Sequence, residues 1–218
     1  MMKLLKKIVE LDKVKKLNNI LDKKISGEAT WVFQGDYIEI DAIVKDIIEN
    51  STKDFSNLID SKKTKDIYWT IRVATKDAAS VAGYMHYDSY RSTVLVPLKL
   101  PNEAPRGDLN IWENSRRHPK YMIVHLFQKV LIQSRLGIKF LKTVYPKKFI
   151  KVTVKPGDTL RFNGFLSLHF NDLPSAERRS LLLHFDREFD SSILTDIIER
   201  YSRFLGKANA KTKTKTKT

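Results

Sequence analysis

Three side chains in this sequence could together hold a metal ion: His86, Asp88 and His169. One residue separates His86 from Asp88, and on a strand residues two apart face the same way. A histidine from a second strand would complete a set of two imidazoles and one carboxylate on one face of a metal. Such a set leaves other coordination positions open. The His-x-Asp pair alone is a weak signal, because any surface strand can carry one.

A second group of residues could bind an anion. Arg178 lies nine residues after His169, and Ser180 follows Arg178 by two, so the two side chains share a face of a predicted strand. A guanidinium fork and a hydroxyl together suit a carboxylate, through parallel charge-assisted bonds and one neutral bond. Arg179 should face the opposite way, and we predict it as a surface or substrate-side charge.

Short strands separated by turns are predicted to position these residues. Each strand is rich in β-branched and aromatic residues, and turn signals such as Pro156-Gly157-Asp158 punctuate the series. The predicted strands cover residues 67–75, 81–88, 92–100, 107–112, 149–154, 159–164 and 178–185. This order favours an α+β fold with a jelly-roll core, a double-stranded β-helix of the cupin-like kind, over residues 67–187.

Helices and a hairpin are predicted around that core, within one domain over residues 1–206. The amino-terminal part, 1–66, is predicted to hold a helix, a hairpin with a turn at Gly35-Asp36 and a second helix. Apolar residues at helical spacing also predict one or two helices in an insertion at 113–148, and a closing helix. The remaining predicted ranges are 2–24 (first helix), 29–40 (hairpin), 41–60 (second helix), 191–205 (closing helix) and 207–218 (Lys/Thr tail, disordered).

Composition narrows the classes of function. The chain has 218 residues, 42% of them apolar, and no cysteine, which excludes disulfide frameworks and thiolate chemistry. The formal net charge of +15 favours an anionic partner: nucleic acid, an anionic membrane surface or an anionic substrate. No apolar run approaches the ~20 residues of a membrane span, and no secretory signal is apparent. We therefore expect a cytoplasmic protein, peripheral at the inner face of the membrane if helix 2–24 is a surface helix rather than one packed on the domain.

In this order and spacing the motifs resemble those of the 2-oxoglutarate/Fe(II)-dependent oxygenases. The set His86-Tyr87-Asp88, His169 and Arg178-Arg179-Ser180 matches the family's HxD…H…RxS pattern. The segment Ala176–Leu181 is similar to a Gly-Glu-Arg-x-Ser-Leu segment common in that family, with alanine in place of glycine. The resemblance covers roughly residues 67–187 and leaves out the ends and residues 113–148.

The resemblance implies a role for each residue. His86, Asp88 and His169 would hold Fe(II), with 2-oxoglutarate and O2 as cosubstrates. Arg178, assisted by Ser180, would pair with the distal carboxylate of 2-oxoglutarate. The products would be succinate, CO2 and a hydroxylated substrate. Tyr84, which shares the face of His86, either lines the cosubstrate pocket or belongs to the core.

The insertion 113–148 is predicted to contact the substrate. Arg116, Arg117 and Lys120 near its start suit an anionic acceptor such as a saccharide or glycolipid, although a solvated helix face explains them equally well. The charge also keeps open a nucleic-acid demethylase of the same superfamily. Against that alternative, the chain lacks the further arginine after Arg178 that is typical of that subfamily. The alternative outside the enzymes is a basic jelly-roll protein that binds polyanions and has no catalytic activity.

Overall fold

Two antiparallel sheets form the centre of the structure, a computed structural model that describes residues 2–5, 8–25, 29–50, 67–76, 85–133 and 135–187. The larger sheet has the strand order β1-β7-β4-β9-β3-β2, and the smaller one has the order β6-β5-β8. The strands of the larger sheet are β1 (Lys3–Leu5), β2 (Thr30–Phe33), β3 (Tyr68–Ala74), β4 (Tyr90–Lys99), β7 (Thr159–Phe162) and β9 (Arg178–Arg187). Those of the smaller sheet are β5 (Leu109–Trp112), β6 (Ile150–Val152) and β8 (Leu168–Asn171).

The two sheets pack against each other through one apolar cluster. Leu95 of β4 and Leu160 and Phe162 of β7 meet Leu109 and Ile111 of β5 in this cluster. These side chains alternate with outward-facing residues along their strands, because successive residues of a strand point to opposite faces. The interior between the sheets is therefore apolar around β4 and β7, and polar side chains reach it at defined strand positions.

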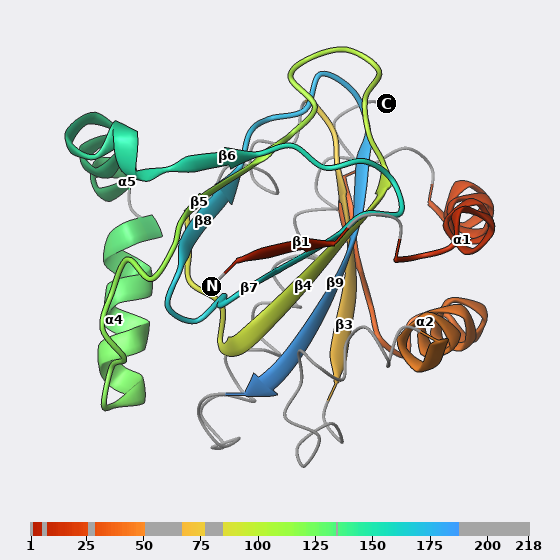
Figure 1. Cartoon of the computed structure of the whole chain (residues 1–218), viewed down its shortest axis with the longest axis horizontal. Coiled ribbons are helices and arrows are strands. Elements are labelled where there is room, and N and C mark those ends of the chain that lie inside the picture. Colours follow the sequence, from red (N-terminus) through yellow and green to blue (C-terminus); the bar gives the residue numbers. More distant parts are fainter. Residues whose placement is uncertain are drawn as a thin grey trace, which may run out of the picture.

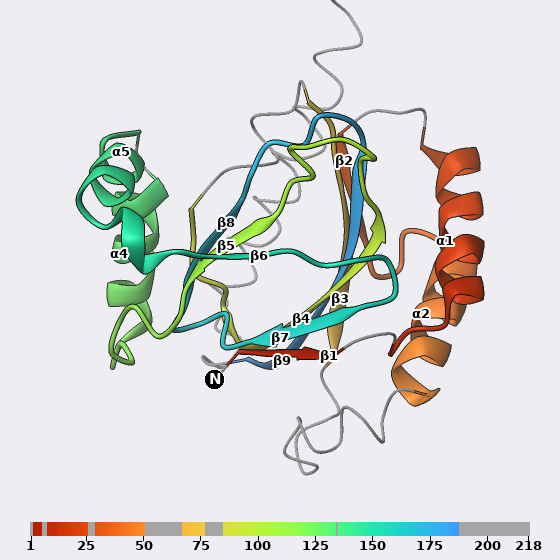
Figure 2. The same ribbon diagram turned by 45° about the horizontal axis from the view of Figure 1, so that its top comes forward.

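Helices α1 (Leu11–Lys24) and α2 (Ile38–Asn50) cover the outer face of the larger sheet (Figure 2). The main core cluster lies beneath them and joins Leu17 and Leu21 of α1 and Ile47 of α2 to buried residues of β3, β4 and β9. Because α1 buries its apolar face there, it does not present that face as a membrane-surface helix. No helix among the described residues is long and apolar enough to cross a membrane.

Helices α4 (Met122–Gln133) and α5 (Arg135–Val144) lie on the other side of the molecule, beside the smaller sheet (Figure 1). The short 3-10 helix η1 (Pro146–Lys148) leads from α5 into β6. Ile132 of α4 and Leu141 of α5 pack against a buried cluster that contains Met85, Tyr87 and Leu168. The insertion is thus helical, as expected, and it packs on the part of the core that contains Tyr87, between His86 and Asp88.

The amino-terminal third differs from the sequence-based expectation in two places. Residues 37–40 were expected as the second strand of a hairpin, but α2 begins at Ile38. The helical period continues through Ile40, Ile43, Val44 and Ile47, all buried, and it outweighs a four-residue alternation. The first helix begins at Leu11, whereas Lys3–Leu5 form β1 by pairing with β7, a contact that local sequence does not reveal. Residues 51–60 and the closing helix at 191–205 lie outside the described residues.

Candidate metal centre and anion site

The segment from His86 to Asp88 lies beside β8, where His169 is located. His86 and His169 form an antiparallel bridge, in which each backbone N–H donates to the other residue's carbonyl at 3.0 and 3.1 Å. The N–H of Asp88 donates to the carbonyl of Gly164 at 2.9 Å. The sequence predicts a strand at 81–88, but the described residues 85–88 form this bridge rather than a strand. The bridge nevertheless brings the His-x-Asp motif to the second histidine.

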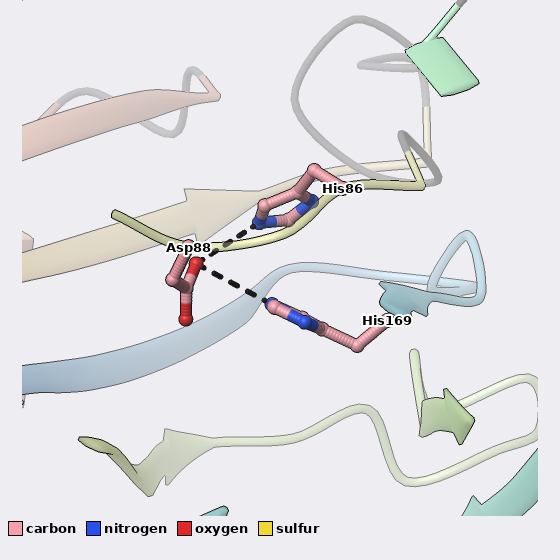
Figure 3. A group of neighbouring side chains, drawn as sticks. All are labelled: His86, Asp88 and His169. Carbon is pink, nitrogen blue, oxygen red and sulfur yellow. Dashed lines mark ion pairs between the residues drawn. The ribbon is translucent and has the colours of Figure 1, made fainter. Parts of the chain in front are cut away.

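The side chains of His86, Asp88 and His169 converge on one point (Figure 3). Oδ1 of Asp88 lies 3.5 Å from Nε2 of His86 and 3.5 Å from Nε2 of His169. One ligand atom from each residue lies within 4.8 Å of the others, which is close enough for all three to bind a single ion. Two neutral imidazoles and one carboxylate form the donor set of a facial triad, so the residues fit Fe(II).

Neighbouring groups hold two of these side chains in orientation. Nδ1 of His169 lies 3.0 Å from the carbonyl of Ser167, so an Nδ1–H donated there leaves the Nε2 lone pair facing the site. The Thr93 hydroxyl donates to Oδ2 of Asp88, which leaves Oδ1 for the metal. The same hydroxyl lies 3.3 Å from Nδ1 of His184. The outer oxygen of Asp88 is thus connected to a buried histidine of β9 through Thr93.

Asp88 is ionised although it is buried. Burial alone would raise the pKa of its carboxyl group, but the two adjacent imidazoles, above all that of His169, hold that pKa well below its usual range. Gly164 makes this packing possible, because a β-carbon at that position would overlap Oδ2 of Asp88 and the Thr93 hydroxyl. A glycine is therefore required next to the carboxylate for steric reasons.

Arg178 and Ser180 lie on β9 and face the interior between the sheets. Arg178 is 2% exposed, and its Nε and Nη2 have no hydrogen-bond partner among the described residues, nor does the Ser180 hydroxyl. Burial lowers the pKa of Arg178 to about 10, although Asp108 opposes the shift. Unsatisfied buried donors are costly. These donors are arranged for an anionic ligand, and a carboxylate would satisfy them.

A second buried arginine, Arg72, stands beside this pair and was not singled out from the sequence. It lies opposite Ser180 in the pairing of β3 with β9, and its Nη1 donates to Oδ1 of Asn171 at 3.0 Å. Burial, together with the charge of Arg178, lowers the pKa of Arg72 to about 9. The sequence signal was a charged residue within the apolar strand 67–75. Two neighbouring guanidinium groups make this end of the interior strongly positive.

The other predicted residues have different surroundings. Arg179 was expected as a surface or substrate-side charge, but it is 2% exposed beneath α1, where it pairs with Asp22 and with Glu177. Its face of β9 is the one that the helices cover. Arg117 and Lys120 are exposed. Tyr84 lies outside the described residues.

Arg116 holds the insertion against the metal-binding segment. Its guanidinium lies 3.8 Å from the centre of the Tyr87 ring and donates to the carbonyl of Phe165 and to Oε1 of Gln128. It also lies 2.9 Å from Nδ1 of His125, on α4. The guanidinium also lies 4.6 Å from the centre of the Phe165 ring. Internal contacts therefore engage this side chain, which the sequence suggested as a substrate ligand.

Comparison with solved structures shows the same fold in 2-oxoglutarate-dependent oxygenases. HygX from Streptomyces hygroscopicus, solved with nickel and 2-oxoglutarate bound, is similar with a TM-score of 0.59 at 11% identity, over 86% of this chain and 83% of HygX. EvdO2 from Micromonospora carbonacea var. aurantiaca is similar with a TM-score of 0.56 at 12% identity, over 84% and 85% of the two chains. A Pseudomonas putida prolyl-4-hydroxylase is similar with a TM-score of 0.52 at 13% identity, over 86% and 93%.

At these low sequence identities, the structural similarity establishes the fold alone. No protein-family model matches the sequence, and no curated protein sequence does. The chain therefore has the double-stranded β-helix fold of the 2-oxoglutarate/Fe(II) oxygenases, as the sequence motifs predicted. Its His86, Asp88 and His169 have the spacing of a metal centre within that fold.

Proposed function

We propose that this protein is an Fe(II)- and 2-oxoglutarate-dependent dioxygenase that hydroxylates an organic substrate. The observation that carries the proposal is the pairing of two sites in one interior. A two-histidine, one-carboxylate set lies on β8 and the segment beside it, and buried Arg178 lies on β9 with donors that no described residue satisfies. The cosubstrate 2-oxoglutarate carries a keto acid at one end for the metal and a carboxylate at the other end for Arg178.

The protein's part in the reaction is to bind and orient. His86, Asp88 and His169 would hold the iron, with His169 fixed by Ser167 and Asp88 fixed by Thr93. The bound iron, with 2-oxoglutarate and O2, supplies an oxidising chemistry that releases succinate and CO2. The Phe162 ring packs edge-to-face against the His169 ring, with the ring centres 4.9 Å apart, and shields that side of the imidazole.

Arg178 would bind the distal carboxylate of 2-oxoglutarate through Nε and Nη2, and Ser180 would add a hydroxyl donor. Charge-assisted and bidentate bonds of this kind are among the strongest that a side chain makes. Arg72, on the neighbouring strand, would add positive potential at this site without touching the carboxylate itself. The same arrangement would disfavour a cosubstrate whose distal end is uncharged.

For the substrate, we propose an anionic molecule such as a saccharide or glycolipid. The support is the basic character of the insertion, whose Arg117 and Lys120 are exposed and available to an anion. We further propose that the protein acts in the cytoplasm, whose reducing conditions suit a chain without cysteine.

The deciding experiment adds Fe(II) and then 2-oxoglutarate to metal-free protein without oxygen. We expect a weak visible absorption band that needs both components and is absent when glutarate, which lacks the keto group, replaces 2-oxoglutarate. Admission of oxygen should then release succinate. His86→Ala should abolish both signals, whereas His118→Ala, at an exposed histidine outside the site, should retain them. A protein that binds polyanions but gives neither signal would be a non-enzymatic module instead.

A further inference from the structure

Several large apolar side chains of α4 and α5 are exposed. Ile123 and Phe127, one turn apart on α4, have 74% and 64% of their surfaces exposed, and Phe140 on α5 is 58% exposed. Tyr121, just before α4, is 59% exposed. Isolated exposed apolar residues are ordinary, but a group of large ones on adjoining helices indicates a contact surface.

This surface is separate from the face by which α4 packs on the protein. His125 is buried, Gln128 bonds to Arg116, and Ile132 packs on the cluster around Tyr87. Residues two apart on a helix lie on nearly opposite sides, because each residue turns by about 100°. Ile123 and Phe127 therefore point away from His125, and α4 is apolar on an outer face that the core of the domain does not use.

The segment that carries both helices has basic residues and no acidic ones. Residues 114–157 contain no aspartate or glutamate. Over the same range they contain eleven basic residues: Arg116, Arg117, Lys120, Lys129, Arg135, Lys139, Lys142, Lys147, Lys148, Lys151 and Lys155. Some of these are engaged within the protein, since Arg116 holds α4 and Lys151 pairs with Asp108 and Asp172. Lys120, Lys139, Lys147 and Lys148 are exposed.

We propose that the outer faces of α4 and α5 lie on an anionic lipid bilayer. Large apolar side chains flanked by lysines are the pattern of helices that lie in a membrane interface: the apolar groups enter the acyl boundary and the lysines meet anionic headgroups. A second copy of the chain fits this face less well, because it would bring two surfaces of the same positive charge together.

The inner face of α4 is linked to the segment that carries two of the metal ligands. The guanidinium of Arg116 joins the inner face of α4 to Tyr87, the residue between His86 and Asp88. Membrane contact at α4 would therefore place this side of the molecule, with the segment that carries two of the three metal ligands, toward the bilayer. Membrane binding can be measured without turnover, so a failure of membrane binding and a failure of the proposed reaction are distinguishable.

A fluorescence experiment can detect insertion of α4 directly. The chain has no cysteine, so a single introduced one can be labelled without side reactions. We would attach an environment-sensitive dye to Phe127→Cys and, as a matched control, to Ile38→Cys. Ile38 is 84% exposed on α2, on the other side of the molecule. Each labelled full-length protein is mixed with vesicles of phosphatidylcholine, with or without phosphatidylglycerol, and with nitroxide-labelled lipid as a quencher.

With anionic vesicles, the dye on Phe127→Cys should shift to the blue and be quenched by the nitroxide lipid, whereas the dye on Ile38→Cys should do neither. Unlabelled Ile123→Ser/Phe127→Ser should bind anionic vesicles at least about tenfold more weakly than the parent, because two large apolar contacts are lost. Ile38→Ser should bind like the parent, and circular dichroism and thermal unfolding should match in all variants.

Three results would overturn the proposal. One is co-sedimentation with anionic vesicles but no response from the dye on Phe127→Cys, because that would mean attachment by the lysine-rich chain end alone. Another is an equal response with purely neutral vesicles. The third is a response that rises with protein concentration without any lipid, because a second copy would then cover the face.

Discussion

The two oxygens of the Asp88 carboxylate have different neighbours, and Thr93 orients the one that does not face the histidines. Oδ1 faces the two imidazoles, and Oδ2 accepts the Thr93 hydroxyl. A carboxylate that binds metal through one oxygen needs the other one fixed, and such outer contacts tune metal affinity. Thr93 is thus a positioning residue, and His184 behind it supports the same hydroxyl.

We predict that Thr93→Val weakens metal binding by about 10- to 100-fold, because Asp88 loses the donor that orients it. Titration with Mn(II) or Co(II) by calorimetry would measure the change without turnover. Thr159→Val is the matched control: the Thr159 hydroxyl is also buried but has no hydrogen-bond partner among the described residues, so its loss should leave metal affinity unchanged. Equal metal affinity in Thr93→Val and the parent would refute the positioning role.

For Arg178→Met we predict opposite effects on two quantities. Affinity for 2-oxoglutarate should fall by about 10- to 100-fold, because charge-assisted hydrogen bonds are lost. The free energy of unfolding without 2-oxoglutarate should instead rise by about 1 kcal/mol, because a buried cation with unsatisfied donors is replaced by an apolar side chain.

Calorimetry and denaturant unfolding would measure these two quantities, with Mn(II) affinity as the control. A parallel loss of metal affinity, or a less stable protein, would show that Arg178 has a structural task instead.

At the scale of elements, the connection between α4 and the core depends on Arg116. This side chain lies over Tyr87, bonds to the Phe165 carbonyl and reaches Gln128 on α4. Burial lowers its pKa to about 10, while the nearby Tyr87 opposes the shift. Arg116 thus links α4 to the segment next to the metal ligands, beside Ser115, whose hydroxyl lies 3.1 Å from the Tyr87 hydroxyl.

We predict that Arg116→Met lowers the free energy of unfolding by about 2–3 kcal/mol, because several hydrogen bonds and a cation–π contact are removed. Amide hydrogen exchange should become faster in α4 first, because α4 loses its main polar attachment. Arg117→Met, at the neighbouring exposed arginine, should change neither quantity. If both variants behaved alike, the contacts of Arg116 would not be what holds the insertion.

The elements that sequence predicted well were those with a strong local pattern. The strands around β3, β4 and β9 and the helical insertion were found because their apolar residues repeat with the right period. Residues 37–40 were misassigned because four alternating residues resemble a strand until the following turns of helix are counted. Lys3–Leu5 could not be recognised, because β1 exists through its pairing with β7.

Some residues of the site could likewise be predicted from the sequence, and others could not. His86, Asp88, His169, Arg178 and Ser180 belong to a motif that can be read along the chain, and the structure brings the three histidine and aspartate side chains together. Thr93 and Gly164 could not be recognised from the sequence, because their role depends on contact with Asp88 in three dimensions. Arg72 had a faint signal, a charge in an apolar strand, but its neighbour Ser180 is known only from strand pairing.

At the scale of the molecule, the helices on its two sides have different surroundings. α1 and α2 bury apolar residues in the main core and cover the larger sheet, whereas α4 and α5 leave several large apolar residues exposed. The side with α4 and α5 is also the side nearer the metal ligands, through Tyr87. The helices that bury their apolar residues and those that expose several of them therefore lie on opposite sides of the sheets (Figure 2).

The pairing of β1 with β7 has a consequence for how the protein behaves at high concentration. β1 has three residues and carries Lys3, and a short, charged strand at the border of a sheet gives other molecules little to pair with. We predict that deletion of residues 1–5 uncovers the backbone of β7 and causes aggregation that grows with concentration, measured by light scattering. Lys3→Thr, which keeps the strand but removes the charge, should aggregate less than the deletion. Five residues distant in sequence from the metal ligands would thus decide whether the protein stays dispersed.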